Sequence, residues 1–383
     1  MSKAAILALL CPSLWAVCPA GYGFFRPITI QHTKVSAFDQ ADFPVLVCFN
    51  GAAPCNGSFP ELAAAANGGK IRNAITGAVP YSHTIPGDFL LVDSDGSTVL
   101  PFEIENYSPV TGELQAWVRK TLSHSADTVI YACLGNASVT TDQSNPHGVW
   151  DPHYAGVWHL ANGSAADSTA NANNGASSAV APGAAQIDGG AVFMSSSHSA
   201  ISLGMNGYSG GGNTATVEGW TKITGPGSSN VNLVFGYGSN AYNQMLAVAY
   251  DDSNNWLLWA GGGTAQAFAP ADFAGWHYLA ATITSGSSHA LYVDGVPANS
   301  GANLYGDGWN VTLGSAGIGS VAAIPTNMDG SVDEVRISNT ARSADWIATE
   351  YSNQSSPGSF YILGDLQQAG ANGPTGGGFL ILR

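Results

Sequence analysis

At 383 residues, the chain is long enough for two domains. Its 48 glycines, 19 prolines and 10% charged residues are typical of short strands joined by tight turns rather than of long exposed helices. The formal charge of −15 disfavours nucleic acid and anionic membrane surfaces as partners. It suits calcium, which takes oxygen ligands, and it equally suits an exported protein that is kept soluble by its charge.

The first residues, MSKAAILALLCPSLWAVCPAG, contain one lysine, an apolar stretch and then small residues. This pattern predicts a signal peptide over residues 1–20, with cleavage after Ala20. The stretch is broken by prolines and is short for a bilayer, and no later segment is apolar enough, so we expect no membrane span after cleavage. The sequence thus predicts a secreted or cell-surface protein.

Three cysteines remain after this cut, and export permits disulfides. Cys48 and Cys55 close a small loop in VCFNGAAPC, so we predict that they form a disulfide. Cys133 alternates within the apolar run VIYACLGN. We therefore interpret it as a buried, unpaired small hydrophobe.

Residues 21–153 are predicted to form an N-terminal β-sandwich, because apolar residues alternate in several short runs separated by turn signals. A short helix ended by Gly68 and Gly69 is expected in FPELAAAANGGKI. In one run, Glu103 and Glu105 share a face, which we interpret as an exposed acidic face. The runs are FRPITIQH, FPVLVCF, DFLLVDS, LPFEIENY, ELQAWVRK and TVIYACLG.

Residues 154–365 contain about eleven further candidate strands, which require two facing sheets to bury their apolar faces. Near the end, SADWIATEY predicts a short helix with Ser343 as its N-cap, lying across a sandwich edge. Residues 366–383 lose this periodicity and are predicted to be a glycine-rich flexible tail.

Two sets of segments resemble known families. FFRPITIQHTKVSAFDQADFPVLV and GVWDPHYAGVWHL resemble an uncharacterised domain family, of unknown function, that precedes laminin-G-like domains in exported bacterial and archaeal proteins. TATVEGWTKI, GWHYLAATIT, HALYVDGVPA and MDGSVDEVRISNTARSADWIATEYSNQ resemble the concanavalin A-like, laminin-G-like superfamily. The resemblance implies an all-β fold of two antiparallel β-sandwich domains, the second a jelly roll. Such domains commonly bind glycans or protein surfaces, and many carry a structural calcium ion.

The returning strand of that jelly roll is DGSVDEVRIS, in which the apolar alternation slips at Asp333 and Glu334. This slip predicts a β-bulge. Adjacent residues on a regular strand point to opposite faces, so these two acids are not expected to form the facing carboxyl pair that glycoside hydrolysis needs.

A metal site is suggested by DSTANANN, where Asp167, Asn171 and Asn173 offer oxygen donors for calcium. The resemblance places this loop near Asp333, which completes the candidate set. The alternative is an Asx-rich turn that satisfies its own backbone. The nine histidines show no zinc-site spacing, and His159, beside Trp158, is interpreted as a packing residue.

Sugars stack their C–H faces on aromatic rings, so exposed rings near turns are candidate carbohydrate-binding residues. The alternative for each is partial burial at the end of the sandwich. The candidates are Tyr237, Tyr242, Trp256, Trp259, Tyr305 and Trp309.

We therefore predict an exported, non-catalytic protein that binds polysaccharide or cell-surface glycan through its laminin-G-like domain, with a structural calcium ion. The alternative is a structural subunit of a surface layer, filament or virion, whose partners would be other protein subunits. A glycoside hydrolase is the third reading.

Overall fold

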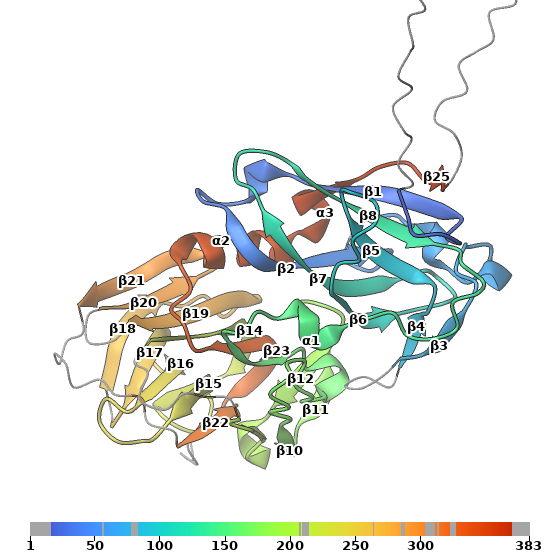
Figure 1. The fold of residues 1–383 in the computed structure, drawn as a ribbon. Coiled ribbons are helices and arrows are strands. Elements are labelled where there is room, and N and C mark those ends of the chain that lie inside the picture. Colours follow the sequence, from blue (N-terminus) through green and yellow to red (C-terminus); the bar gives the residue numbers. More distant parts are fainter. Residues whose placement is uncertain are drawn as a thin grey trace, which may run out of the picture.

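The computed structural model describes residues 17–55, 57–77, 83–206, 208, 214–262, 264–284, 288–302, 311, 314–321 and 327–369. Over these residues the protein is mostly β, and its strands form two antiparallel sandwiches that lie side by side (Figure 1). The predicted all-β fold is therefore confirmed.

The first sandwich has its core between two small sheets, one ordered β24-β1-β8-β5, with β25 also paired to β1, and one ordered β2-β7-β6; β3 and β4 form a separate hairpin. Its large buried side chains include Phe43, Trp117 and Ile130. The strands are β1 (Phe24–Ile30), β2 (Gln40–Phe49), β3 (Ala74–Thr76), β4 (Thr84–Pro86), β5 (Phe89–Asp93), β6 (Phe102–Tyr107), β7 (Leu114–Leu122), β8 (Thr128–Leu134), β24 (Tyr361–Leu363) and β25 (Gln367–Gln368).

The helix expected before Gly68 is replaced by two separate 3-10 turns, Pro60–Leu62 and Ala65–Asn67. Ala64, between the two turns, has an extended backbone, so the helix does not continue through it. Its N–H donates to the backbone carbonyl of Pro109 instead. Gly68 does adopt the left-handed conformation that ends such a turn, with φ 88°. Neighbouring segments thus take the backbone hydrogen bonds that a longer helix would need.

The second sandwich has a seven-stranded sheet ordered β10-β13-β22-β15-β16-β17-β18, which faces an eight-stranded sheet ordered β11-β12-β23-β14-β19-β20-β21, with β9 also paired to β23. Its inner core includes Val217, Phe235 and Leu258. The strands are β9 (Tyr154–Trp158), β10 (Ala176–Ser178), β11 (Ala181–Gly183), β12 (Gly190–Phe193), β13 (Ala200–Leu203), β14 (Ala215–Gly225), β15 (Val231–Gly238), β16 (Met245–Asp251), β17 (Asn255–Gly261), β18 (Thr264–Pro270), β19 (His277–Thr284), β20 (Ser288–Val293), β21 (Val296–Ala302), β22 (Ser315–Ile318) and β23 (Asp329–Ser338).

The returning strand β23 contains the predicted bulge. Its pairing with β14 skips between Asp333 and Arg336, and Glu334 has a φ of 54°. Asp333 and Arg336 lie opposite Trp220 and Glu218 and so share the outer face of the sheet, whereas the residues flanking the bulge, such as Val335, enter the core. The bulge also brings Glu334 to the outer face, where it contacts Arg336.

After the second sandwich the chain returns to the first one. Two short helices accompany this path, α2 (Ala344–Ser355) and α3 (Pro357–Phe360), whereas α1 (Pro146–Val149) lies earlier, between β8 and β9. The predicted N-cap is confirmed, because Ser343 Oγ accepts a hydrogen bond from Trp346 N at 3.1 Å. The strand β24, which falls within the range 154–365, pairs with β1 of the first sandwich (Figure 1).

The outer face of the eight-stranded sheet forms the junction with the rest of the molecule. Trp220, Tyr278 and Tyr292 pack there against Ile347 and Tyr351 of α2. The start of α2 also joins the core of the first sandwich through Trp346. Helix α2 therefore contacts both sandwiches (Figure 1).

Two disulfides are present. The predicted bond between Cys48 and Cys55 is confirmed. Cys133 is buried as expected, but the prediction that its thiol is unpaired is wrong, because it is bonded to Cys18. The sequence argument missed this bond because it assigned Cys18 to the cleaved segment.

Candidate functional site

The first candidate site is a cluster of charged side chains buried where the two sandwiches meet. It consists of Glu103 and Glu105 from β6, His159 after β9, and Glu334 and Arg336 from β23, and we call it the junction centre. All five residues are no more than 3% exposed. The expectation that Glu103 and Glu105 form an exposed acidic face is therefore wrong: the shared face is covered by the second sandwich.

His159 lies at the middle of the junction centre. Its Nδ1 atom is 2.7 Å from Glu334 Oε1 and 3.6 Å from Glu105 Oε1. Its Nε2 atom is 3.5 Å from Glu103 Oε2. The imidazole ring thus faces carboxyl groups from both sandwiches, and the interpretation of His159 as a packing residue misses this role.

Arg336 balances part of this negative charge. Its guanidinium donates to Glu334 Oε2 at 2.8 Å and to Glu350 Oε1 at 2.7 Å. It also lies 4.5 Å from the ring centre of Trp117 and 5.1 Å from that of Trp150. A buried charge needs such partners, since an unpaired one is strongly destabilising.

Glu105 and Glu334 of the junction centre, and Asp333 beside them, have displaced pKa values. Burial, followed by the nearby charge of Asp188, raises the pKa of Glu105 well above its usual value. Burial and the charge of Glu334 raise the pKa of Asp333 in the same way. Burial also opposes ionisation of Glu334, but His159 and Arg336 outweigh it and lower the pKa of Glu334.

Asp188 connects the cluster with the surface. The residue is exposed, but its carboxyl group contacts Glu105 and is shielded from water, and this shielding, together with Glu334, raises its pKa to about 7. Asp188 marks the side on which solvent comes nearest to the junction centre.

The burial of the junction centre restricts its chemistry. Asp333 and Glu334 do share one face, because of the bulge, so the argument that they point to opposite faces is wrong. Both are, however, no more than 1% exposed. A sugar polymer has no access to carboxyl groups that are covered in this way, and hydrolysis requires that access.

Glu105, His159 and Glu334 could hold a metal ion, because one ligand atom from each lies within 4.8 Å of the others. This group differs from the calcium set predicted from the sequence. Among the described residues it is the one group of three or more His, Cys, Asp or Glu side chains with such spacing.

The four residues predicted to bind calcium are only partly brought together. Asp167 accepts hydrogen bonds from Val157 N, Thr169 N and Oγ1, and Asn173 N, at 2.7–3.0 Å. The side-chain amides of Asn171 and Asn173 donate to backbone carbonyls, including that of Ala155. Asp333 instead accepts from Ile187 N. The loop satisfies its own backbone, and calcium at these residues stays a prediction.

The predicted aromatic residues occupy different environments. Tyr237 and Trp256 are no more than 2% exposed and belong to the inner core, so their rings offer no face for stacking and they leave the candidate set. Trp259 is half-buried on the outer side of the seven-stranded sheet, and Tyr242 is 48% exposed. Tyr305 and Trp309 lie outside the described residues.

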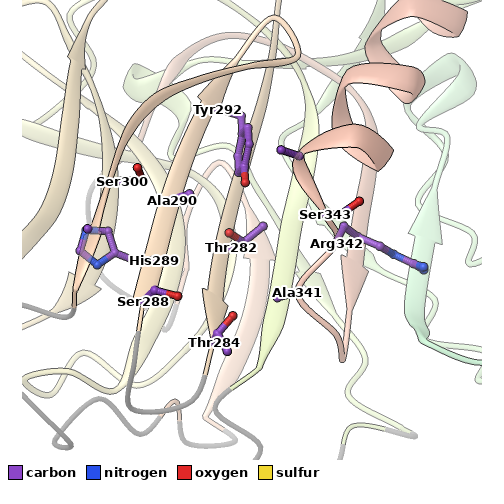
Figure 2. Close-up of a pocket in the computed structure, with 12 residues that line it drawn as sticks. Thr282, Thr284, Ser288, His289, Ala290, Tyr292, Ser300, Ala341, Arg342 and Ser343 are labelled. Atoms are coloured by element: carbon purple, nitrogen blue, oxygen red, sulfur yellow. The ribbon is translucent and has the colours of Figure 1, made fainter. Parts of the chain in front are cut away.

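The second candidate site is an open hollow of about 480 Å³ on the outer face of β19, β20 and β21. Figure 2 shows these strands on one side of it and the segment that leads into α2 on the other. We call it the hydroxyl-lined hollow, because most of its polar side chains are alcohols. It is lined by Thr282, Thr284, Ser288, His289, Ala290, Tyr292, Ser300, Gly301, Ala341, Arg342, Ser343 and Ala344.

The hydroxyl-lined hollow carries little net charge. Arg342 lies at its side, but the guanidinium points away from the hollow in Figure 2 and donates to both oxygens of Asp151, at 2.7 and 3.0 Å. The described lining residues include no carboxylate. Tyr292 supplies an aromatic ring; burial raises its pKa above the usual value, and a hydrogen bond with Thr282 only partly opposes this. The site suits a neutral ligand rich in hydroxyl groups.

Two facing antiparallel sheets with a returning central strand define a concanavalin A-like sandwich. Residues 195–348 match the family described as the concanavalin A-like lectin/glucanases superfamily. This part of the chain is therefore a concanavalin A-like domain, and the match does not reach the first sandwich. No curated protein matches the chain.

Solved structures also resemble part of the chain. Domain 4 of AbnA, an extracellular arabinanase from Geobacillus stearothermophilus solved in complex with arabinotriose, is 20% identical, with a TM-score of 0.41 over 52% of this chain and 98% of that one. The binding domain of botulinum neurotoxin serotype D is 16% identical, with a TM-score of 0.43 over 53% of this chain. The match spans about half of the toxin domain, at 52%.

Proposed function

We propose that the protein is an exported, non-catalytic glycan-binding protein and that its concanavalin A-like domain binds a neutral saccharide in the hydroxyl-lined hollow. The observation that carries this proposal is the hollow itself. Its volume of about 480 Å³ falls in the range of ligand pockets, roughly 300–1,000 Å³.

The hollow offers what a saccharide needs. Thr282, Ser288 and Ser300 can donate to and accept from sugar hydroxyls, and Tyr292 provides a ring for a C–H face. Arg342 is neutralised by Asp151, so an anionic sugar gains little there. The two disulfides support the exported location, since such bonds persist in oxidising compartments.

Binding of the purified protein to a glycan array, followed by calorimetry with the best ligand, tests the proposal. Thr282→Val keeps the side-chain volume but removes the hydroxyl, and Ser300→Ala removes a second one. We expect each variant to weaken binding by about fivefold or more, because a hydrogen bond contributes about 1 kcal/mol. The control is Ser253→Ala, on an exposed turn of the same domain.

Tyr242, which is exposed, and Trp259, which is half-buried, provide the rival location. If Tyr242→Ala and Trp259→Ala remove binding while Thr282→Val and Ser300→Ala preserve it, the ligand lies on the other sheet and the hollow is not the site. If no neutral glycan binds at all, the proposed function is overturned.

A further inference from the structure

We propose that Glu105, His159 and Glu334 bind one divalent transition-metal ion of the zinc class, which joins the first sandwich to the second. The ligand atoms would be Glu105 Oε1, His159 Nδ1 and Glu334 Oε1. This proposal is independent of glycan binding, because the hydroxyl-lined hollow shares no residue with the junction centre.

The two carboxylates are held in the orientation that a metal site needs. Glu105 Oε2 accepts a hydrogen bond from Trp117 Nε1 at 2.8 Å, and Glu334 Oε2 accepts one from Arg336 Nη2 at 2.8 Å. These donors fix one oxygen of each glutamate and direct the other oxygen toward His159 Nδ1. Outer contacts of this kind orient the ligands of metal sites.

One buried carboxylate oxygen of the proposed ligand set accepts no hydrogen bond. Within the part of the chain that the structure describes, Glu105 Oε1 is buried without a hydrogen-bond donor, and Glu105 is 3% exposed. Leaving such an acceptor unpaired is unfavourable, whereas a cation between Glu105 and Glu334 would satisfy it.

The second ring nitrogen of His159, Nε2, faces Glu103. His159 Nε2 is 3.5 Å from Glu103 Oε2, and Glu103 is itself held by Trp150 Nε1 at 3.0 Å and by Ser168 Oγ at 2.6 Å. A histidine that binds a metal through one ring nitrogen commonly gives its other N–H to a carboxylate. Glu103 is placed to accept that proton and to fix the tautomer.

The donor set selects the class of ion. One imidazole nitrogen and two carboxylates form a three-ligand set of the kind that zinc and its neighbours accept, with a fourth position for water or for Asp188. Calcium prefers six to eight oxygen ligands, and magnesium keeps most of its water. The nitrogen ligand and the small number of converging oxygens therefore disfavour both.

The ligands come from distant parts of the sequence, since Glu105 belongs to β6 of the first sandwich and Glu334 to β23 of the second. They meet only in the folded chain, so metal binding and folding should be coupled. The ion would act as a clamp between the sandwiches and not as a catalyst, because substrates cannot reach it.

The test measures the metal content of the whole protein, purified without chelators from zinc- or cobalt-supplemented medium. We expect about one ion per chain in the wild type. We also expect a visible Co²⁺ absorption spectrum without thiolate charge transfer, and a melting temperature that falls when the protein is prepared without metal. Elemental analysis showing no ion, with a melting temperature that does not depend on metal, overturns the proposal from the wild type alone.

Matched variants locate the ion. Glu105→Gln keeps an acceptor for Trp117 but weakens the ligand, and we expect at least about a tenfold loss of metal affinity. Glu218→Gln changes another buried carboxyl group at the same junction and should leave the metal content unchanged. Equal metal content in the wild type and in both variants would place the ion elsewhere and contradict the proposal.

Discussion

Glu218 is a single buried carboxyl group whose proton should influence stability. It lies on β14, is 1% exposed, and neither of its oxygens has a hydrogen-bond donor among the described residues. Burial, followed by the charge of Glu350, raises the pKa of Glu218 well above its usual value of 4.5. Arg336 and Arg342 act in the opposite direction but do not outweigh these effects. Glu350 accepts from Arg336, Tyr154 and Tyr278, so the proton belongs on Glu218.

This arrangement predicts a particular dependence on pH. The folded state keeps a proton on Glu218 that the unfolded state releases near pH 4.5, so the stabilisation is complete below that pH and is lost as the pH rises through the folded pKa. Glu218→Gln stays neutral and should be more stable than the wild type at pH 8, by on the order of 1 kcal/mol or more, and similar at pH 4. Denaturant unfolding at both pH values measures this, with Asp252→Asn as an exposed control. A Gln variant that is less stable at pH 8 would contradict the assignment.

Cys18 gives a second prediction at the scale of the residue. Its bond to Cys133 closes a separation of 115 residues, so replacing both cysteines by serine should lower the free energy of unfolding by about 2–4 kcal/mol. Cleavage after Ala20 and this bond exclude each other. We therefore expect the mature protein to retain Cys18, which intact-mass measurement and non-reducing peptide mapping can check. A mature chain that starts at Gly21 would lack Cys18 and would contradict this bond.

At the scale of the element, the segment after the second sandwich protects an open strand edge. In the three-stranded sheet, β2 is at the edge, and its outward backbone groups need partners. The side chain of Asn353 in α2 accepts from Leu46 N at 2.7 Å and donates to Leu46 O at 3.1 Å. Tyr361 does the same for Cys48, at 3.0 and 2.7 Å. Two side chains thus take the place of a neighbouring strand.

Asn353→Ala removes one of these partners and leaves a buried N–H and C=O unsatisfied. We expect a loss of about 2–5 kcal/mol in the free energy of unfolding, since each unpaired buried group costs about 1–3 kcal/mol. The neighbouring Ser352→Ala on the same helix serves as the control. Denaturant unfolding measures the loss, and an unchanged dependence of the unfolding free energy on denaturant concentration would assign the effect to the folded state. Equal stability of the two variants would contradict this role of Asn353.

The sequence predicts the strands, the helix cap and the bulge better than it predicts which surfaces pack against one another. The alternating runs, the cap at Ser343 and the bulge in β23 are local signals, and each is confirmed. The junction centre is not local. The spacing of Glu103 and Glu105 shows that they share a face, but nothing in the pattern indicates that a second sandwich covers it. The same limit applies to Trp256, because the sequence alone does not distinguish a ring at a rim from one in the core.

At the scale of the whole molecule, the two sandwiches should unfold together. Helix α2 packs on both, and the junction centre and the aromatic cluster around Trp220 and Tyr278 would be exposed if they separated. We expect one transition in calorimetry, with equal calorimetric and van't Hoff enthalpies. Two resolved transitions would show that the junction is weaker than this packing suggests.

Assembly is the remaining question at this scale, because a structural subunit of a surface layer, filament or virion is the alternative to a binding protein. Size-exclusion chromatography with light scattering, with and without residues 370–383, distinguishes the two. We expect the proposed binding protein to be a monodisperse monomer in both cases. Among the described residues, no helix is both long and apolar enough to cross a membrane.

The return of the chain to its starting sheet has a consequence for biosynthesis. Strand β1 begins at Phe24, yet one of its partners, β24, begins only at Tyr361. Domains usually complete folding in the order in which the ribosome makes them. Here the module that is made first must wait for Tyr361–Leu363, which are made after the whole second sandwich, so its β1 edge stays open until β24 has been synthesised.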